Sequence, residues 1–441
     1  MKLTLEQAEQ MMKKNNGNLY LYERTDITEL PDNLTVGGYL DLYNTKITSL
    51  PDNLTVGGYL DLSNTKITSL PDNLTIGGGL YLNNTAITSL PDNLTVDGDL
   101  DLRNAAITSL PNNLTVGRYL DLSNTKIKSL PDNLTVGGIL FLSNTAITSL
   151  PDNLAVGGGL YLCNTAITSL PNNLTVGGCL DLSNTKIKSL PDNLTVGDCL
   201  ELSNTEITSL PDNLTVGGDL YLRNTTITSL PDNLTVGGSI YLYDTAITSL
   251  PDNIAVGGSP DLYGTKIASL PGNLTIGGRL YLYGTKITDK DKELSKVKRL
   301  KDGDYVPNRY IYADRILTHI RAKRHIDGYD LYVGKIKGHN VISDGKHYAH
   351  CRTFKEGVAD LLFKNAKDRG AEQYKDLTLD STVTKDEAIT MYRIITGACR
   401  QGTERFVNSL GKLKDTYTVK EIIKLTKGQY NSECFEKFFE R

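Results

Sequence analysis

The sequence predicts a β-rich solenoid that follows a short helix and precedes a separate α+β domain. Three observations support this: a motif recurs every twenty residues, apolar side chains alternate at period two inside each copy, and the motif stops after residue 289. In proteins with such a period, each unit buries its apolar side chains against its neighbours. We expect thirteen regular coils over residues 30–289, a degenerate coil over residues 17–29, a cap over residues 1–16 and a basic α+β domain over residues 290–441.

Each coil is expected to contain two short strands. In the copy LPDNLTVGGYLDLYNTKITS at residues 30–49, Leu34, Val36, Leu40 and Leu42 alternate with polar residues. This is the pattern of strands that bury one face, and the period of a helix is absent. The LTVGG stretch therefore predicts a second strand and a coil that is flatter than a steep horseshoe.

The strand segment also resembles a known repeat. GYLDLYNTKI matches the leucine-rich-repeat frame LxxLxLxxNxL, with Leu40, Leu42 and Ile47 at the leucine places and Thr45 where Asn or Cys is usual. We expect the Thr45 hydroxyl to serve the buried turn instead. The Leu-Pro pair and the short period are similar to the repeats of secreted bacterial effectors of the YopM and IpaH type over residues 17–289. The resemblance implies a parallel sheet and a binding role.

The positions that vary between copies lie on the outward side of the predicted strand. One column holds seven acids and six aromatic residues: Asp41, Asp61, Tyr81, Asp101, Asp121, Phe141, Tyr161, Asp181, Glu201, Tyr221, Tyr241, Asp261 and Tyr281. Five residues later most acids are accompanied by Lys and most aromatic residues by Ala or Thr. Either the Lys relieves repulsion in the acidic stack, or the linkage records duplication of two ancestral units.

This column supplies the predicted ligand-binding face. It runs over Tyr81, Asp101, Asp121, Phe141, Tyr161, Asp181, Glu201, Tyr221, Tyr241, Asp261 and Tyr281. Exposed aromatic side chains are typical anchors of protein interfaces, so we expect a protein ligand, with a glycan or nucleic acid as open alternatives.

Some recurring positions indicate scaffold rather than site. Asn33 and Asn44 recur in most copies, and stacked amides would form ladders along the axis. Pro260 occupies a Leu40-type place, where it removes a backbone donor and predicts a local weakness in the sheet. Cys179 and Cys199 share a column on adjacent coils, with Cys163 nearby. The six cysteines show no CxxC spacing, so neither a disulfide framework nor a zinc knuckle is predicted, and a soft metal held by these three thiols is the less favoured alternative.

The segment before the repeats predicts a helix over residues 4–14. Thr4 and Gln7 form a capping-box pattern at its start. The apolar side chains expected to cover the first coil are Leu3, Leu5, Ala8 and Met11.

The segment after the repeats begins with a charged helix, DKDKELSKVKRL, and continues with strands near residues 310–320, 329–336, 339–343 and 347–351. A hairpin turn is expected at Asp344-Gly345. Three capping boxes predict helix starts, at Thr353 with Glu356, Thr384 with Glu387 and Thr418 with Glu421. A last helix is expected over residues 433–439.

The histidines mark the one region where acid–base or metal chemistry is conceivable, because all five lie between His319 and His350. On a strand, however, His347 and His350 would point to opposite faces. The Cys-x-Asp motif of the IpaH ligase domain is absent, as are phosphate-loop, dinucleotide and Ser/His/Asp patterns. The sequence thus predicts no catalytic residue, metal or cofactor, and favours a non-enzymatic role.

Charge is unevenly distributed along the chain. Residues 290–441 contain 31 Lys and Arg against 22 Asp and Glu, whereas residues 1–289 contain 16 against 29. A candidate basic patch comprises Arg321, Lys323, Arg324, Lys335 and Lys337. An alternative function is therefore a targeting arm that carries a catalytic or nucleic-acid-binding C-terminal domain.

The expected setting is the cytoplasm of a bacterium or of an infected host cell. Asn-Leu-Thr recurs at nearly every turn and would be glycosylated in a eukaryotic secretory pathway, which favours a bacterial or phage origin. The sequence shows no classical signal peptide and no membrane-spanning segment. We therefore expect an interaction protein, such as an effector or inhibitor.

Overall fold

The computed structural model describes residues 1–92, 94–172, 174–368, 370–398, 400–411, 413–429 and 432–439. For residues 362, 363, 365–367, 372, 401, 402, 405, 434 and 437 it describes the backbone alone. The chain divides into two compact units. The solenoid unit comprises Met1–Arg321 with Lys335–Lys337, and the C-terminal unit comprises Ala322–Gly334 with Gly338–Arg441.

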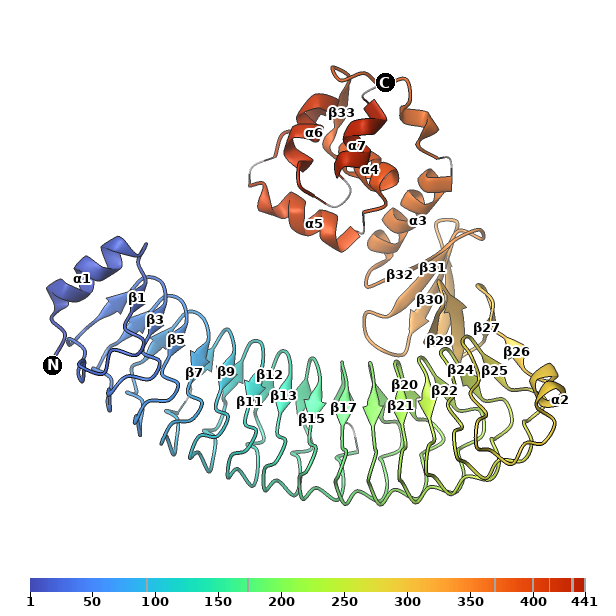
Figure 1. The fold of residues 1–441 in the computed structure, drawn as a ribbon, viewed down its shortest axis with the longest axis horizontal. Coiled ribbons are helices and arrows are strands. Elements are labelled where there is room, and N and C mark those ends of the chain that lie inside the picture. Colours follow the sequence, from blue (N-terminus) through green and yellow to red (C-terminus); the bar gives the residue numbers. More distant parts are fainter. Residues whose placement is uncertain are drawn as a thin grey trace. The chain divides into compact units, whose positions relative to one another are not determined.

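The solenoid unit is a row of coils, and each of the first eleven regular coils adds one short strand to each of two sheets (Figure 1). Neighbouring strands are parallel and in register, so that Leu40 pairs with Leu60 and Asp41 with Asp61. The first sheet contains β1 (Leu19–Tyr20), β3 (Leu40–Asp41), β5 (Leu60–Asp61), β7 (Leu80–Tyr81), β9 (Leu100–Asp101), β11 (Leu120–Asp121), β13 (Leu140–Phe141), β15 (Leu160–Tyr161), β17 (Leu180–Asp181), β19 (Leu200–Glu201), β21 (Leu220–Tyr221) and β23 (Ile240–Tyr241).

The second sheet confirms the strand predicted from the LTVGG stretch. Its first section contains β2 (Thr35–Val36), β4 (Thr55–Val56) and β6 (Thr75–Ile76). Its second section contains β8 (Thr95–Val96), β10 (Thr115–Val116), β12 (Thr135–Val136), β14 (Ala155–Val156), β16 (Thr175–Val176), β18 (Thr195–Val196), β20 (Thr215–Val216), β22 (Thr235–Val236), β24 (Ala255–Val256), β25 (Thr275–Ile276) and β26 (Lys298–Arg299). The predicted parallel solenoid is thereby confirmed.

One continuous apolar core runs between the two sheets along the coils. Leu34, Val36, Leu40, Leu42 and Ile47 are fully buried, and their equivalents in later coils form the same core. Each such side chain contributes about 1.5–3 kcal/mol when it is buried. Because part of this burial comes from the neighbouring coil, the stability of one coil depends on the next.

The N-terminal end of the core is covered by helix α1 (Leu5–Lys14), as predicted, and the Thr4–Gln7 capping box is present. Leu3 and Ala8 are buried and Met11 packs against the core, but Leu5 is 46% exposed, so its expected place in the cap was wrong. Leu3 N donates to the Glu29 carbonyl at 3.0 Å. This pairing holds Leu3 against the first coil and leaves Leu5 at the solvent side of the helix start.

The turn after each first-sheet strand depends on a residue that tolerates a left-handed backbone. Asn44 has a φ of 55°, and Asp244, Gly264 and Gly284 occupy the same place in later coils, also with positive φ. Asn, Asp and Gly are the residues that adopt this conformation most readily. The buried Thr45 hydroxyl then donates to the Leu42 carbonyl at 2.9 Å, which confirms its expected role. The recurring Asn therefore has a backbone function besides the amide contacts that some neighbours make.

Glycine allows the coils to approach closely along the second sheet. A Cβ on Gly177 would lie 2.2 Å from the Gly157 carbonyl oxygen. At the equivalent position in the fourth regular coil the residue is Asp97, and the second sheet is interrupted there, between β6 and β8. A cavity of about 280 Å³ opens between these two coils, lined in part by Ile76 and Leu94. We conclude that a side chain at this position separates adjacent coils.

Pro260 has the expected effect on the first sheet. The regular strands end at β23, and beyond it the sheet continues only through the isolated bridges Tyr241 to Asp261 and Asp261 to Tyr281. Proline has no N–H to donate to the next coil, so the ladder is weakened at this position.

Replacing Gly177 by Ala should destabilise the solenoid unit by about 1–3 kcal/mol, because the added methyl group collides with the backbone of the preceding coil. The measurement is the thermal unfolding midpoint. Gly272→Ala is the matched control, since a Cβ there meets nothing within 4 Å. Equal midpoints for the two variants would refute the close-approach argument.

The chain that follows the repeats still belongs to the solenoid unit as far as Arg321. Helix α2 (Lys290–Ser295) is followed by β26, which pairs with β25, and by the antiparallel strands β27 (Tyr305–Val306), β28 (Tyr310–Ala313) and β29 (Ile316–Ile326). Residues 310–320, predicted as one strand, are two strands joined by a turn at Asp314 and Arg315, which both have positive φ. Tyr312 and Leu317 pack against Ala255, so this segment covers the end of the repeats.

The C-terminal unit is α+β, as predicted. Its antiparallel strands are β30 (Tyr329–Gly334), β31 (Asn340–Ser343) and β32 (Tyr348–Cys351). After them come α3 (Phe354–Asp368), η1 (Ala371–Tyr374), β33 (Thr382–Thr384), α4 (Lys385–Thr396), α5 (Arg400–Ser409), β34 (Thr416–Thr418), α6 (Val419–Thr426) and α7 (Ser432–Phe439). The three capping boxes begin α3, α4 and α6 as expected, whereas α5 and the strand pair β33–β34 were not predicted. Among the described residues, no helix combines the length and apolar character needed to cross a membrane.

Candidate functional site

The outward side of the first sheet carries three columns of side chains. Because side chains alternate along a strand, residues two before and two after the predicted column point to the same side as it does. We call these three columns the outer face. The flanking columns add aromatic residues that the sequence analysis missed: Tyr39, Tyr59 and Tyr119 before the strand, and Tyr43, Tyr243, Tyr263 and Tyr283 after it. The alternation around Leu40 and Leu42 was the signal that would have found them.

Aromatic side chains gather in two places on the outer face. The N-terminal aromatic cluster comprises Tyr39, Tyr59, Tyr81, Tyr119, Phe141 and Tyr161. The ring centroids of Tyr39 and Tyr59 are 5.1 Å apart, and those of Phe141 and Tyr161 are 4.9 Å apart. The C-terminal aromatic cluster comprises Tyr221, Tyr241, Tyr243, Tyr263 and Tyr283.

The C-terminal aromatic cluster is the more exposed of the two. Tyr243 and Tyr263 are 39% and 40% exposed, and Tyr283 is 72% exposed. Tyr221 and Tyr241 stack with parallel rings 4.6 Å apart, and the Arg223 guanidinium lies 5.1 Å from the Tyr241 ring centroid. The ring contacts hold these side chains in one orientation, so that binding a partner costs little side-chain entropy.

The acids of the central column support the turn that follows the strand. Asp41 accepts a hydrogen bond from Tyr43 N at 3.0 Å, and Asp181 accepts one from Ser183 N at 2.9 Å. Across the described coils, the lysines of the second column make no ion pair with these acids. A backbone N–H on the same coil compensates these carboxylates directly, and relief of the acidic stack by lysine at longer range stays a prediction. Burial nevertheless raises the pKa of Asp41.

Two acids of the predicted face are covered by arginine. Asp101 and Asp121 are only 2% and 9% exposed. Arg103 binds Asp101 at 2.6 Å and Asp121 at 3.3 Å, and Arg118 lies 3.5 Å from Asp99. These carboxylates are engaged within the solenoid, so the accessible acidic part of the face lies elsewhere.

Between the two aromatic clusters, Asp181 and Glu201 are half-buried and are not covered by arginine, although each accepts a backbone N–H. Beside them, Cys179 and Cys199 form a disulfide with a Cα–Cα distance of 4.5 Å. The expectation of no disulfide was therefore wrong: adjacent coils bring the same column within bonding distance, although the residues are twenty apart in sequence. Cys163 lies in a different column and its thiol contacts the Ser143 hydroxyl at 3.0 Å. The side chains of Cys399 and Cys434 lie outside the described part.

The histidines do not form a shared site. His347 Nε2 lies 3.0 Å from the Asp368 carboxylate, at the end of α3, whereas His325 Nδ1 lies 3.0 Å from Asp330. Burial raises the pKa of the Cys351 thiol to about 11, so this cysteine is not an activated nucleophile.

The candidate basic patch is distributed over both units. Arg321, Lys335 and Lys337 belong to the solenoid unit, and Lys323 and Arg324 belong to the C-terminal unit. Lys323 is paired with Asp330 at 2.8 Å and its ammonium lies 5.1 Å from the Tyr332 ring centroid. Part of the predicted positive charge is thus neutralised locally.

Within the solenoid unit a polar pocket of about 430 Å³ is lined by Arg309, His319, Lys335, Asp212 and Asp232, together with neighbouring turn residues. Arg309 donates to the Asn233 and Asn253 carbonyls, and burial lowers its pKa. Burial and the nearby Arg309 lower the pKa of Lys335 as well. Two cations and two carboxylates line the pocket, so its formal charge is balanced.

The repeat length, the strand pairing and the core residues together identify the fold. The coils repeat every twenty residues, their strands pair in parallel, and the leucines of the repeat frame fill the core. The protein is a leucine-rich-repeat solenoid. No family model matches the chain, and no curated protein matches it.

Solved leucine-rich-repeat structures resemble the solenoid at low identity. The leucine-rich effector protein YopM from Yersinia pestis is 20% identical, with 68% of this chain and 84% of that chain covered and a TM-score of 0.43. A leucine-rich-repeat protein of Leptospira interrogans is 18% identical, with 68% and 100% covered and a TM-score of 0.38. The Toll–Spätzle complex of Drosophila is 13% identical, with 77% and 66% covered and a TM-score of 0.35. Likeness at this level bears on neither activity nor partner.

The buried His319 lines this polar pocket, and its protonation can be tested through the pH dependence of stability. Burial lowers its pKa from 6.5 to about 4, and its Nε2 lies 2.9 Å from the Val216 carbonyl, to which it donates as a neutral imidazole. Between pH 6.5 and 4 the unfolded chain therefore binds a proton that the folded chain does not. Stability should be complete above pH 6.5 and fall by up to about 3 kcal/mol as the pH drops to 4.

Thermal midpoints of wild type and His319→Gln across this pH range measure the effect. Gln retains an N–H donor for Val216 but does not titrate, so the variant should lose stability less steeply below pH 6.5. Identical pH profiles would contradict the assignment of a neutral, buried His319.

Proposed function

We propose that this solenoid is a non-enzymatic binding protein that captures another protein through its outer face. The observation that carries the proposal is the C-terminal aromatic cluster, in which exposed tyrosines from adjacent coils are held in contact with one another. Tyrosines that are ordered before binding are typical anchors of protein interfaces, because each buries a large area with few rotatable bonds.

Ring geometry favours a protein over a glycan. A sugar stacks on a free aromatic face, but the facing sides of Tyr221 and Tyr241 are occupied by each other, with an interplanar angle of 1°. The ring edges remain available for a protein surface. The Tyr221 hydroxyl lies 3.1 Å from Asp219, and burial together with this carboxylate raises the pKa of Tyr221 to about 12. The hydroxyl therefore stays protonated at physiological pH and donates to the Asp219 carboxylate, which fixes the ring.

Charge adds selectivity to the proposed face. Asp181 and Glu201 present carboxylates between the two aromatic clusters, and the cations near them in sequence are Lys186, Lys188 and Arg223. Lys188 is paired with Glu206 at 3.5 Å. A partner with basic side chains opposite Asp181 and Glu201 would be favoured, and rim charges of this kind act chiefly on the rate of association.

The proposed setting is the cytoplasm of a bacterium or of a cell infected by one or by a phage, where the protein would act as an effector or inhibitor. The support is the repeated Asn-Leu-Thr sequence, which a eukaryotic secretory pathway would glycosylate.

The alternative function is a targeting arm for a catalytic or nucleic-acid-binding C-terminal domain, whose support is the net positive charge of residues 290–441. Against it, Lys323 and Lys346 are paired with Asp330 and Asp368. Paired lysines release fewer counterions from a nucleic acid than free ones do, which weakens the electrostatic part of binding.

Changing Tyr243, Tyr263 and Tyr283 together to Ala should weaken partner binding at least about a hundredfold, since each anchor contributes roughly 1–2 kcal/mol. The thermal midpoint should change little because these side chains are exposed. The measurement is quantitative mass spectrometry of proteins retained from lysate of the native cell by wild type and by variant.

The control is Asp52→Ala, Asp132→Ala and Asp192→Ala, which removes three exposed side chains at the Leu-Pro-Asp-Asn turns, outside the outer face. This control should retain the same partner as wild type. If the tyrosine variant also retains it undiminished, the outer face is not the binding site.

The alternative function, a nucleic-acid-binding C-terminal domain, is tested by measuring nucleic-acid retention and light scattering of the full chain across a salt series. We expect no retention of duplex DNA or RNA and a monomer in light scattering at every salt concentration. Retention whose log affinity falls with log salt by about 0.9 per neutralised phosphate would support a nucleic-acid-binding domain instead. Association that disappears as salt rises would indicate attraction between the acidic repeats of one copy and the basic end of another.

A further inference from the structure

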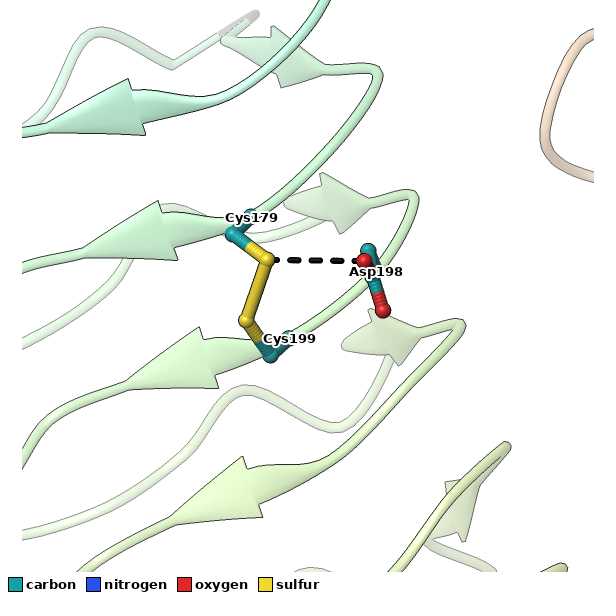
Figure 2. Close-up of side chains that lie close together, drawn as sticks. All are labelled: Cys179, Asp198 and Cys199. Atoms are coloured by element: carbon teal, nitrogen blue, oxygen red, sulfur yellow. Dashed lines mark hydrogen bonds between the residues drawn. A yellow bond between two sulfur atoms is a disulfide. The ribbon is translucent and has the colours of Figure 1, made fainter.

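Two sulfur atoms of the outer face lie beside a carboxylate from the bend that precedes β19. Cys179 and Cys199 precede β17 and β19 on adjacent coils, and the Asp198 carboxylate lies 3.5 Å from the Cys179 sulfur (Figure 2). One potential ligand atom from each residue lies within 4.8 Å of the other two. Both cysteines are half-buried and Asp198 is exposed, so the group is accessible from solvent.

Two neighbouring copies depart from the repeat sequence together where these residues meet. The Asp198 position is Gly in eleven of the thirteen regular copies and Arg118 in one other. The cysteine column holds Cys in two copies, and these two are adjacent. Because one coil contributes Cys179 and the next contributes both Asp198 and Cys199, the departure produces a cluster rather than scattered substitutions.

The surroundings of the cluster are negatively charged. Asp181 and Glu201 follow the two cysteines on the same strands, and Asp219 occupies the next position of the cysteine column. Carboxylates at strand spacing raise the local concentration of cations and stabilise a bound one. This acidic surface is not explained by the aromatic clusters on either side of it.

We propose that reduction of the Cys179–Cys199 disulfide opens a site for a thiophilic divalent cation of the Zn²⁺ class, with the two thiolates and the Asp198 carboxylate as ligands. In a tetrahedral zinc site with Zn–S near 2.3 Å and Zn–O near 2.1 Å, ligand atoms are about 3.6–3.8 Å apart. The 3.5 Å between the Cys179 sulfur and Asp198 already matches this spacing. The Cα–Cα distance of 4.5 Å allows the sulfurs to separate to the same range by side-chain rotation.

A dithiol reductant can open the Cys179–Cys199 disulfide. The reductant transfers two electrons to the disulfide, the S–S bond breaks, both protein thiols are formed, and the reductant becomes a disulfide. The cation then displaces one proton from each thiol, so two metal–sulfur bonds form and two protons are released to solvent. The carboxylate of Asp198 binds in its ionised form, and the fourth position remains open on the outer face.

The site lies between the two aromatic clusters, so its state changes the surface offered to a partner. In the oxidised form the disulfide presents a neutral, apolar group between carboxylates. With metal bound, the two thiolates and the Asp198 carboxylate offset the charge of the cation, and the same position instead offers an open coordination place to a ligand atom of the partner. This inference does not depend on the proposed partner, because metal uptake is measured on the isolated protein.

The test is a Co²⁺ titration of the full chain in anaerobic buffer, with and without prior reduction by a dithiol that is then removed. Co²⁺ is a spectroscopic substitute for Zn²⁺ whose thiolate complexes absorb in the near ultraviolet. Reduced wild type should show this absorption, saturating at one equivalent and disappearing when Zn²⁺ is added. Oxidised wild type should show none. No absorption in the reduced protein would overturn the proposal.

Variants separate this site from the other thiols of the chain. Cys179→Ser and Cys199→Ser should abolish the saturating absorption, whereas Cys163→Ser should retain it. Ser239 and Ser259 occupy the same column, so the serine variants are expected to fold, and their thermal midpoints verify this. Undiminished absorption in Cys179→Ser would assign the metal to other cysteines and contradict the site.

Asp198→Asn tests the carboxylate separately. It should weaken the apparent affinity at least tenfold while leaving the stoichiometry at one equivalent, because two thiolates remain. Unchanged affinity would remove Asp198 from the ligand set. Asp52→Asn, at an exposed turn of an earlier coil, is the control and should bind as wild type does.

Discussion

The structure depends on the backbone pairing between coils that are twenty residues apart. Leu40 N donates to the Tyr59 carbonyl at 2.9 Å and Leu42 N to the Asp61 carbonyl at 2.8 Å, and the pattern is repeated along the first sheet. Because the register does not shift, each side chain lies beside its equivalent in the next coil at roughly 4.8 Å. Residues at equivalent positions of adjacent copies are therefore neighbours in space. Glycine at the second sheet permits this spacing, and Asp97 shows what happens when a side chain replaces it.

The same register accounts for the chemistry of the outer face. It places tyrosines of one column in ring contact, as for Tyr263 and Tyr283 at 5.5 Å, and it brings Cys179 within bonding distance of Cys199. Acids that would repel one another at this spacing are retained because each accepts a backbone N–H on its own coil, as Asp181 does from Ser183. The ordered tyrosines, the column of carboxylates and the disulfide of the outer face all follow from the in-register pairing of the coils.

The solenoid could be predicted from sequence because its period and its Leu40-type pattern determine which side chains are inward. The Thr45 hydroxyl contact and the Pro260 weakness followed from the chemistry of single residues. Contacts between coils were harder. To predict the disulfide and the ion pair between Arg103 and Asp101, the register between adjacent coils must be known. To find the missed columns around Tyr243, all outward positions of the strand must be considered together. In the C-terminal unit, capping boxes located α3, α4 and α6, whereas α5 begins at Arg400 without such a box and was missed.

The central claim is that the outer face, rather than the C-terminal unit, contacts the partner. Covalent labelling of tyrosines, followed by mass spectrometry with and without the captured partner, measures this directly. The account predicts that Tyr243, Tyr263 and Tyr283 lose reactivity in the complex, while the exposed Tyr22 at the N-terminal end of the repeats serves as an internal reference. Protection confined to tyrosines of the C-terminal unit, with Tyr243, Tyr263 and Tyr283 labelled as in the free protein, would contradict it.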